Sequence, residues 1–115
     1  MATRPTPRRT SAAARTIGSQ LQAWRKLLDL PAQIVAERAG ISRSTLSRLE
    51  NGDVHVGMET FLNVASALGV LDAVVSATDP YTTDFGRARA DQQLPQRVRR
   101  PKEPTWPGSQ TASSS

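Results

Sequence analysis

One stretch, "AERAGISRSTLSRLENG" over residues 36–52, constrains the fold of this chain more than any other. It sets two short apolar patterns around Gly40, and the second pattern also carries Arg43, Ser44 and Arg48. A glycine supplies the backbone angles that a tight turn between helices needs. The stretch therefore predicts two short helices joined by a glycine turn, the second with basic and hydroxyl side chains on its outer face.

Apolar residues at three- and four-residue spacing predict five helices over residues 15–78, an all-α domain with a modest core. In the first helix, one face carries Ile17, Leu21, Trp24 and Leu28. The helices are expected to run from Thr16 to about Asp29, from Pro31 to before Gly40, from the N-cap Ser42 to "ENG", from Glu59 to Leu68, and from Leu71 to Ala77. Their expected inner faces include Val35, Ala36, Ala39, Ile41, Leu46, Leu49, Phe61, Leu62, Ala65 and Leu68.

The basic residues are concentrated in two arms outside this domain. The net charge is +5, but residues 1–15 hold four arginines and no acid, whereas residues 16–80 hold five basic and seven acidic side chains. We expect residues 1–14 to be a disordered basic arm and residues 101–115 to be disordered. Residues 79–100 are expected to be a basic tail with a marginal helix from about Thr83 to Gln93, which is ordered only against a partner or against the body of the domain. Such arms bind polyanions or simply keep a chain soluble.

The composition argues against an enzyme, a cofactor and a metal site. There is no cysteine, and the single histidine, His55, lies in a turn-like stretch, so the residues for a nucleophile, a base or a ligand cluster are missing. No apolar run suits a membrane span or a signal peptide. We expect a cytoplasmic protein without a membrane partner; an organelle transit peptide is the alternative for the arginine-rich start, although Pro5 and Pro7 oppose an amphipathic helix there.

Two helices joined in this way form a helix-turn-helix, whose second helix enters the DNA major groove. With Leu46 and Leu49 in the core, the outer face of the second helix carries Arg43, Ser44, Ser47 and Arg48. An arginine fork can donate two hydrogen bonds to one guanine, a contact that is worth roughly 1–3 kcal/mol of base discrimination. The alternative interpretation, for each arginine considered by itself, is that Arg43 and Arg48 are ordinary solvated arginines on an exposed helix face.

"LQAWRKLLDL", "AQIVAERAGISRSTLSRLENG" and "METFLNVASALGV", in this order, resemble the Cro/CI-type (XRE) helix-turn-helix regulators of bacteria and phages. The resemblance implies a five-helix lambda-repressor-like DNA-binding domain in a bacterial, nucleoid-associated protein, which binds an operator as a homodimer. It implies DNA contacts from Arg43, Ser44, Ser47 and Arg48, a phosphate contact from Asn51, and a structural ion pair between Arg25 and Glu50.

The chain departs from this family where the second helix begins. The usual Thr-Gln is replaced by Pro31-Ala32, with Gln33 one place later. We expect Gln33, or the arm residues Arg4, Arg8, Arg9 and Arg15, to supply the missing contact to the DNA backbone.

The tail "DPYTTDFGRARADQQLPQRVRRP" resembles the C-terminal region of HipB-like antitoxins, which repress their own operon and bind a HipA-like kinase toxin. A disordered basic tail is the equal alternative. Its apolar anchors would be Tyr81, Phe85, Leu94 and Val98, with Trp106 as another candidate.

The prediction from sequence is an autoregulatory repressor that reads a palindromic operator as a homodimer. Its dimer surface is expected on the fourth and fifth helices, at Val70, Leu71, Val74 and Val75, unless these residues are internal core. The alternatives are a protein-interaction module that neutralises a partner through its tail and binds DNA only non-specifically, and an RNA-binding protein, which the few aromatic residues disfavour.

Overall fold

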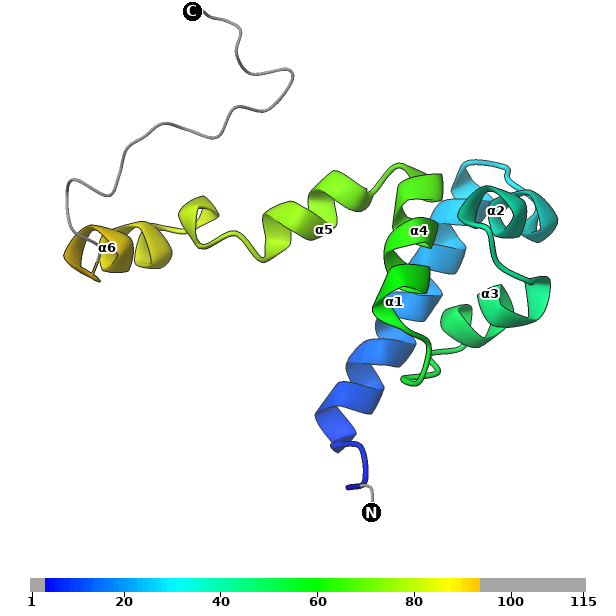
Figure 1. Ribbon diagram of the computed structural model, residues 1–115, viewed down its shortest axis with the longest axis horizontal. Helices are drawn as coiled ribbons and strands as arrows, with labels where there is room; N and C mark the ends of the chain where they lie inside the picture. The colour runs from blue at the N-terminus through cyan, green and yellow to red at the C-terminus, as the bar shows by residue number, and fades with distance from the viewer. Residues whose placement is uncertain (1–3, 94–115) are drawn as a thin grey trace, which may run out of the picture. The chain divides into compact units, whose positions relative to one another are not determined.

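The computed structural model describes residues 4–93, and this part of the chain is helical with no strand. The described residues form two compact units, one up to Val75 and one from Ser76 onward. The elements, labelled in Figure 1, are α1 (Arg8–Leu27), α2 (Ala32–Ala39), α3 (Arg43–Glu50), α4 (Met58–Leu68), α5 (Leu71–Ala77), the 3₁₀ helix η1 (Pro80–Thr82) and α6 (Asp84–Gln93). The expected all-α class is confirmed.

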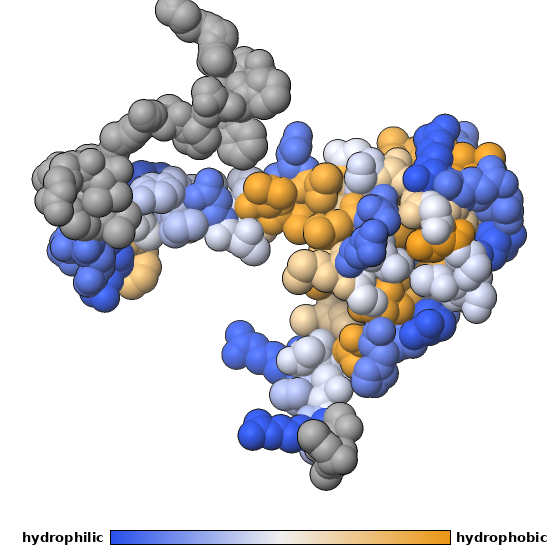
Figure 2. Space-filling view, in the orientation of Figure 1, coloured by the Kyte–Doolittle hydropathy of each residue, from blue (hydrophilic) through white to orange (hydrophobic). Residues whose placement is uncertain are grey.

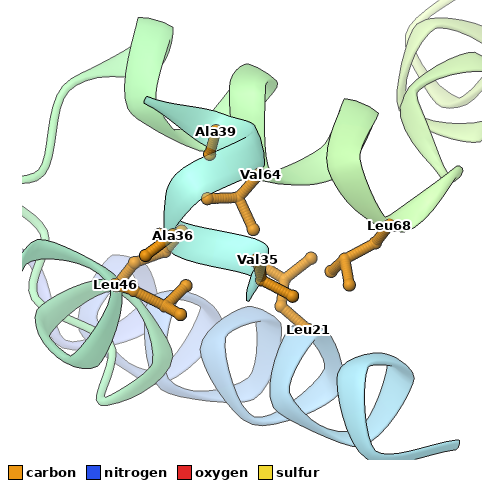
Figure 3. Packing of buried hydrophobic residues seen from close by; sticks show 8 residues of the cluster. Leu21, Val35, Ala36, Ala39, Leu46, Val64 and Leu68 are labelled. Atoms are coloured by element: carbon orange, nitrogen blue, oxygen red, sulfur yellow. The ribbon is translucent and has the colours of Figure 1, made fainter. Parts of the chain in front are cut away.

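The core of the first unit lies where four helices meet. α2 packs against α4 and α3, while α1 packs against α3 and α4. Val35 of α2 and Val64 of α4 are fully buried at the centre, and Figure 3 shows side chains of α1 and α3 converging on them. The buried apolar residues are Leu21, Val35, Ala36, Ala39, Leu46, Leu49, Val64, Ala65 and Leu68. Because α2 contributes small alanines to this centre, α3 and α4 can approach it closely.

The turn between α2 and α3 is built as expected. Gly40 adopts a left-handed conformation with φ of 71°. The N–H of Ile41 donates a hydrogen bond to the carbonyl of Ala36 at 2.9 Å. Ser42 caps α3, because its Oγ accepts a hydrogen bond from the N–H of Thr45 at 3.0 Å. One glycine therefore ends α2 in a left-handed turn, and one serine caps the start of α3.

The start of α1 corrects the expectation of a disordered arm. The helix begins at Arg8, directly after Pro7, and the N–H of Ser11 donates to the carbonyl of Pro7 at 3.0 Å. Residues 8–14 of the expected arm are thus helical. The physical reason is the alanine run at 12–14, because alanine has the highest helix propensity and Pro7 precedes the helix without interrupting it. Residues 1–3 lie outside the described residues.

The face of α1 that the apolar spacing marked is mostly not core. Leu21 is 5% exposed, but Ile17, Trp24 and Leu28 are each more than 40% exposed. α3 instead packs against the neighbouring side of α1, where Gly18 is buried. A Cβ at Gly18 would lie 2.4 Å from the carbonyl oxygen of Leu49 and 2.6 Å from that of Glu50. A missing side chain, and not a large apolar one, therefore sets the contact between α1 and α3.

The second unit contains η1 and α6, which pack against each other. The carboxylate of Asp79 accepts the N–H of Tyr81 at 2.9 Å, and Gly86 lies directly against the carbonyl of Pro80. No residue of η1 or α6 is buried. The helix expected over Thr83–Gln93 is present one residue shorter. The expected anchors Leu94, Val98 and Trp106, and the segment 101–115, lie outside the described residues. No helix within residues 4–93 has the length and apolar character to cross a membrane.

Candidate nucleic-acid interface

α3 is anchored on one side and exposes its polar residues on the other. Leu46 is 1% exposed and Leu49 is 7% exposed, so the helix cannot rotate without unpacking the core. Its exposed positions are Arg43, Ser44, Ser47 and Arg48, with Asn51 at the C-terminal cap. The structure thus brings these five sequence-predicted residues together on one solvent-facing surface.

Arg48 is oriented by an ion pair with the loop that follows α3. Its Nε donates to Oδ2 of Asp53 at 2.8 Å, which leaves both terminal nitrogens for other partners. The other carboxylate oxygen of Asp53 accepts the backbone N–H of His55 at 2.8 Å. These hydrogen bonds, the one from His55 first and the one from Arg48 second, lower the pKa of the Asp53 carboxyl. Both side chains remain partly exposed, so the pair orients the guanidinium without burying it.

Arg25 and Glu50 form the expected ion pair, which holds α1 against the end of α3. Arg25 donates from Nε to Oε2 of Glu50 at 2.8 Å and from Nη2 to Oε1 at 3.1 Å. Only 13% and 7% of the two side chains are exposed. The hydrogen bonds that Arg25 donates to Glu50 raise the pKa of Arg25, and burial opposes them. A third hydrogen bond, from Nη1 to the carbonyl of Leu30 at 3.4 Å, also ties the pair to the loop before α2.

A cleft of about 400 Å³ lies beside this ion pair, between α1, the start of α2 and α3. Its lining residues are Gln22, Arg25, Ala32, Arg43, Ser44, Leu46, Ser47 and Glu50. Gln22 was not singled out from the sequence. Its Nε2 donates to Oε1 of Glu50 at 3.4 Å, and the residue lines the cleft. The sequence could have indicated Gln22, because it lies three residues before Arg25, and side chains at this spacing are neighbours on a helix.

Gln33 does not line this cleft; Ala32 does. The side chain of Gln33 is exposed on α2, and its Nε2 donates to Oε2 of Glu37 at 3.0 Å. The one-place shift relative to the usual pattern turns the amide by about 100° around α2. The expected role of Gln33 in gripping the DNA backbone stays a prediction.

Asn51 and Ser47 are linked at the end of α3, with Nδ2 of Asn51 lying 3.4 Å from Oγ of Ser47. Next to them, Gly52 contacts the backbone of Arg15, since a Cβ at Gly52 would lie 2.6 Å from Cα of Arg15. Arg15 therefore lies close to the C-terminal end of α3. Arg8 and Arg9 lie in the first turn of the same helix, N-terminal to Arg15.

The surface contains no candidate metal centre within residues 4–93, where no three His, Asp or Glu side chains gather. His55 is exposed in the loop between α3 and α4.

A comparison with protein families matches residues 21–72 to a family model described as helix-turn-helix. This span runs from Leu21 in α1 to the start of α5 and includes the whole cleft and the outer face of α3. No curated protein and no solved structure gave a match to the chain.

Proposed function

Because residues 21–72 are a Cro/CI-type helix-turn-helix domain, we propose that this DNA-binding regulator places α3 in the major groove and reads an operator there. The observation that carries the proposal is the anchoring of α3 by Leu46 and Leu49, with Arg43 and Arg48 on the opposite face. Arg43 and Arg48 read base edges, and the hydroxyls of Ser44 and Ser47 bind bases or phosphates. Asn51 binds a backbone phosphate.

The regulator acts as a homodimer that represses its own gene by occupying a palindromic operator. Two copies of α3 then enter the groove about one helical turn, roughly 34 Å, apart. α5 supports the proposal because none of its residues is buried and Val75 is 61% exposed. Figure 2 shows an apolar patch over this helix. Val70, Leu71 and Val74 are half-buried beside it.

The dimer surface is tested by the mass of the protein in solution. We expect Val75→Glu to shift a dimer to a monomer in light scattering, since it places a charge in an apolar contact. Ala73→Glu is the matched control, because Ala73 is exposed on another side of α5. A dimer that withstands Val75→Glu would show that another surface joins the subunits.

An antitoxin role is the second candidate, and the aromatic residues of the second unit favour it. Tyr81 is 51% exposed and Phe85 is 76% exposed, and the guanidinium of Arg89 lies 5.9 Å from the ring centre of Phe85. A HipA-like kinase toxin would be the partner. Co-purification of a kinase encoded in the same operon, abolished by Tyr81→Ala/Phe85→Ala with DNA binding unchanged, is the expected result. Unchanged co-purification would contradict this candidate.

DNA recognition is tested with the DNA upstream of the gene and with a scrambled duplex of equal length, each at two salt concentrations. Arg43→Ala/Arg48→Ala should abolish the preference for the upstream DNA. Arg38→Ala is the matched control, because it also removes an exposed arginine. Arg38 belongs to α2 and not to α3, and it lies about 140° around α2 from Gln33, the residue of that helix that is expected to contact DNA. Equal binding of both duplexes by the wild-type protein would refute sequence-specific recognition by α3.

A further inference from the structure

The first two turns of α1, residues 8–15, form a helical extension that carries three arginines and no acid. The side chains of Arg8, Arg9 and Arg15 are exposed, and none of them forms an ion pair or hydrogen bond with the rest of residues 4–93. The first acid in the sequence is Asp29. These arginines are therefore open to an external anion, although Asp53 lines the same hollow as Thr10, Ala13 and Ala14 of the extension.

Two close backbone contacts fix the extension relative to α3. Gly18 lies against the carbonyls of Leu49 and Glu50, and Gly52 lies against the backbone and Cγ of Arg15. The Arg25–Glu50 ion pair adds a third attachment further along α1. Since α1 is one continuous helix, the positions of arginines in the extension are set by the same contacts that position α3. Figure 1 shows this start of α1 continuing past the loop between α3 and α4.

Helical spacing divides the three arginines between two sides. Arg8 and Arg15 are seven residues apart, which is almost two full turns, so they share one side at a separation of about 10 Å. Arg15 adjoins Gly52, so this side borders the C-terminal end of α3. Arg9 lies about a quarter turn further around the helix, away from that border.

We propose that Arg8 and Arg15 form a rigid helical clamp on backbone phosphates of duplex DNA, on the flank of the site that α3 reads. This inference rests on the proposed function, because α3 must lie on DNA for the clamp to reach the same duplex. An arginine fork binds phosphate oxygens through two parallel hydrogen bonds. Such contacts carry no sequence information, so the clamp adds affinity and fixes the register of α3.

The first test compares Arg8→Gln/Arg15→Gln with Arg9→Gln on the upstream and scrambled duplexes. Each neutralised phosphate contributes about 0.9 to the slope of log K against log salt. We expect the double variant to lose about 2 from this slope per protomer on both duplexes, and Arg9→Gln to change it by far less. A slope unchanged in the double variant, or lowered as much per charge by Arg9→Gln, would overturn the proposal.

The second test asks whether the helix itself matters, with every charge retained. Ala12 is exposed within the extension, and Ala12→Pro should unwind the residues before it while Arg15 stays in α1. A rigid clamp predicts that Ala12→Pro removes the contribution of Arg8, about 1 in the slope, as Arg8→Gln does. A silent Ala12→Pro would show that a flexible arm suffices and would overturn the rigid clamp. The melting temperature confirms that the core is intact.

The two proposals fail in different ways. If the clamp is absent, the protein still prefers the upstream DNA, and only the Arg8 and Arg15 variants leave the slope of log K against log salt unchanged. If α3 does not read sequence, both duplexes bind equally, yet the slope on the scrambled duplex still responds to Arg8→Gln/Arg15→Gln. No binding to either duplex would overturn both.

Discussion

At the scale of single residues, close backbone contacts position α3 and its exposed face. Gly18 allows α1 to touch the last carbonyls of α3, and the Arg25–Glu50 ion pair holds the contact closed. Gly18 and Arg25 both lie on α1, and Glu50 is the last residue of α3. Their replacement is therefore expected to change folding stability and DNA binding together.

Gly18→Ala should destabilise the protein, because the added methyl group would meet two backbone carbonyl oxygens that have little freedom to move. Overpacking of this kind costs about 1–3 kcal/mol. The change is measured as the free energy of unfolding in urea. Gly57→Ala is the control, since a Cβ there meets nothing within 4 Å. Equal stability of the two variants would contradict the close contact.

The Arg25–Glu50 pair should behave as a coupled unit. Arg25→Met or Glu50→Leu alone leaves one charge, only 13% or 7% exposed in the pair, without its partner, which costs about 3–5 kcal/mol where the remaining charge is buried. The double variant Arg25→Met/Glu50→Leu should recover most of that loss, because no charge then stays buried. Chemical unfolding of all four proteins measures the coupling energy. Strictly additive losses would show that the two charges do not stabilise each other.

The Asp53 carboxyl gives a pH-dependent contribution. Because its pKa is lower in the folded protein, its contribution to stability is present above the ordinary aspartate value of about 3.9. It is lost as the pH falls through the lowered pKa. An NMR titration of the carboxyl carbon should place its midpoint below the ordinary value, and Arg48→Gln should raise it. A midpoint that is the same in Arg48→Gln and in the wild type would contradict the ion pair.

At the scale of elements, each short helix of the first unit begins and ends where local chemistry dictates. The expected bounds of α2, α3 and α5 agree with the structure to within a residue because glycines, a proline and a serine mark their ends. The start of α1 was missed by eight residues. Thr16 marks where the apolar spacing begins, whereas the alanine run at 12–14 continues the helix without any apolar pattern.

Ser42→Ala should weaken α3, because the N–H of Thr45 loses the Oγ that caps it at 3.0 Å. Loss of such a cap costs about 1 kcal/mol. We expect a lower melting temperature and weaker binding to the upstream DNA. Ser42→Asp is the matched control, since aspartate also caps helices. A stability of Ser42→Ala equal to that of the wild type would show that the cap contributes nothing.

At the scale of the whole molecule, the buried core of residues 4–93 lies in the first unit. The nine buried apolar residues of this described part lie between Leu21 and Leu68, whereas η1 and α6 bury none. The described part of the second unit, residues 76–93, therefore has no buried core of its own.

A chain ending at Thr78 should unfold with the same midpoint in urea as the full chain, since it retains every residue that is buried within residues 4–93. The affinity for the upstream DNA should fall only by the contribution of the charges that are removed with the tail. Circular dichroism and DNA titration measure the two effects. A substantially lower midpoint would show that residues beyond Thr78 stabilise the first unit.

The helix-turn-helix could be predicted without a structure, because Gly40, Ser42 and the spacing of Leu46 and Leu49 act locally or through helical periodicity. The same periodicity identified the exposed residues of α3, and the resemblance supplied the Arg25–Glu50 pair. Tertiary structure decided which side of α1 faces α3, which placed Gly18 and Gln22 at the contact and left Trp24 half-exposed. The physical reason is that close packing depends on which backbones meet, and apolar spacing does not reveal that a missing side chain makes a contact possible.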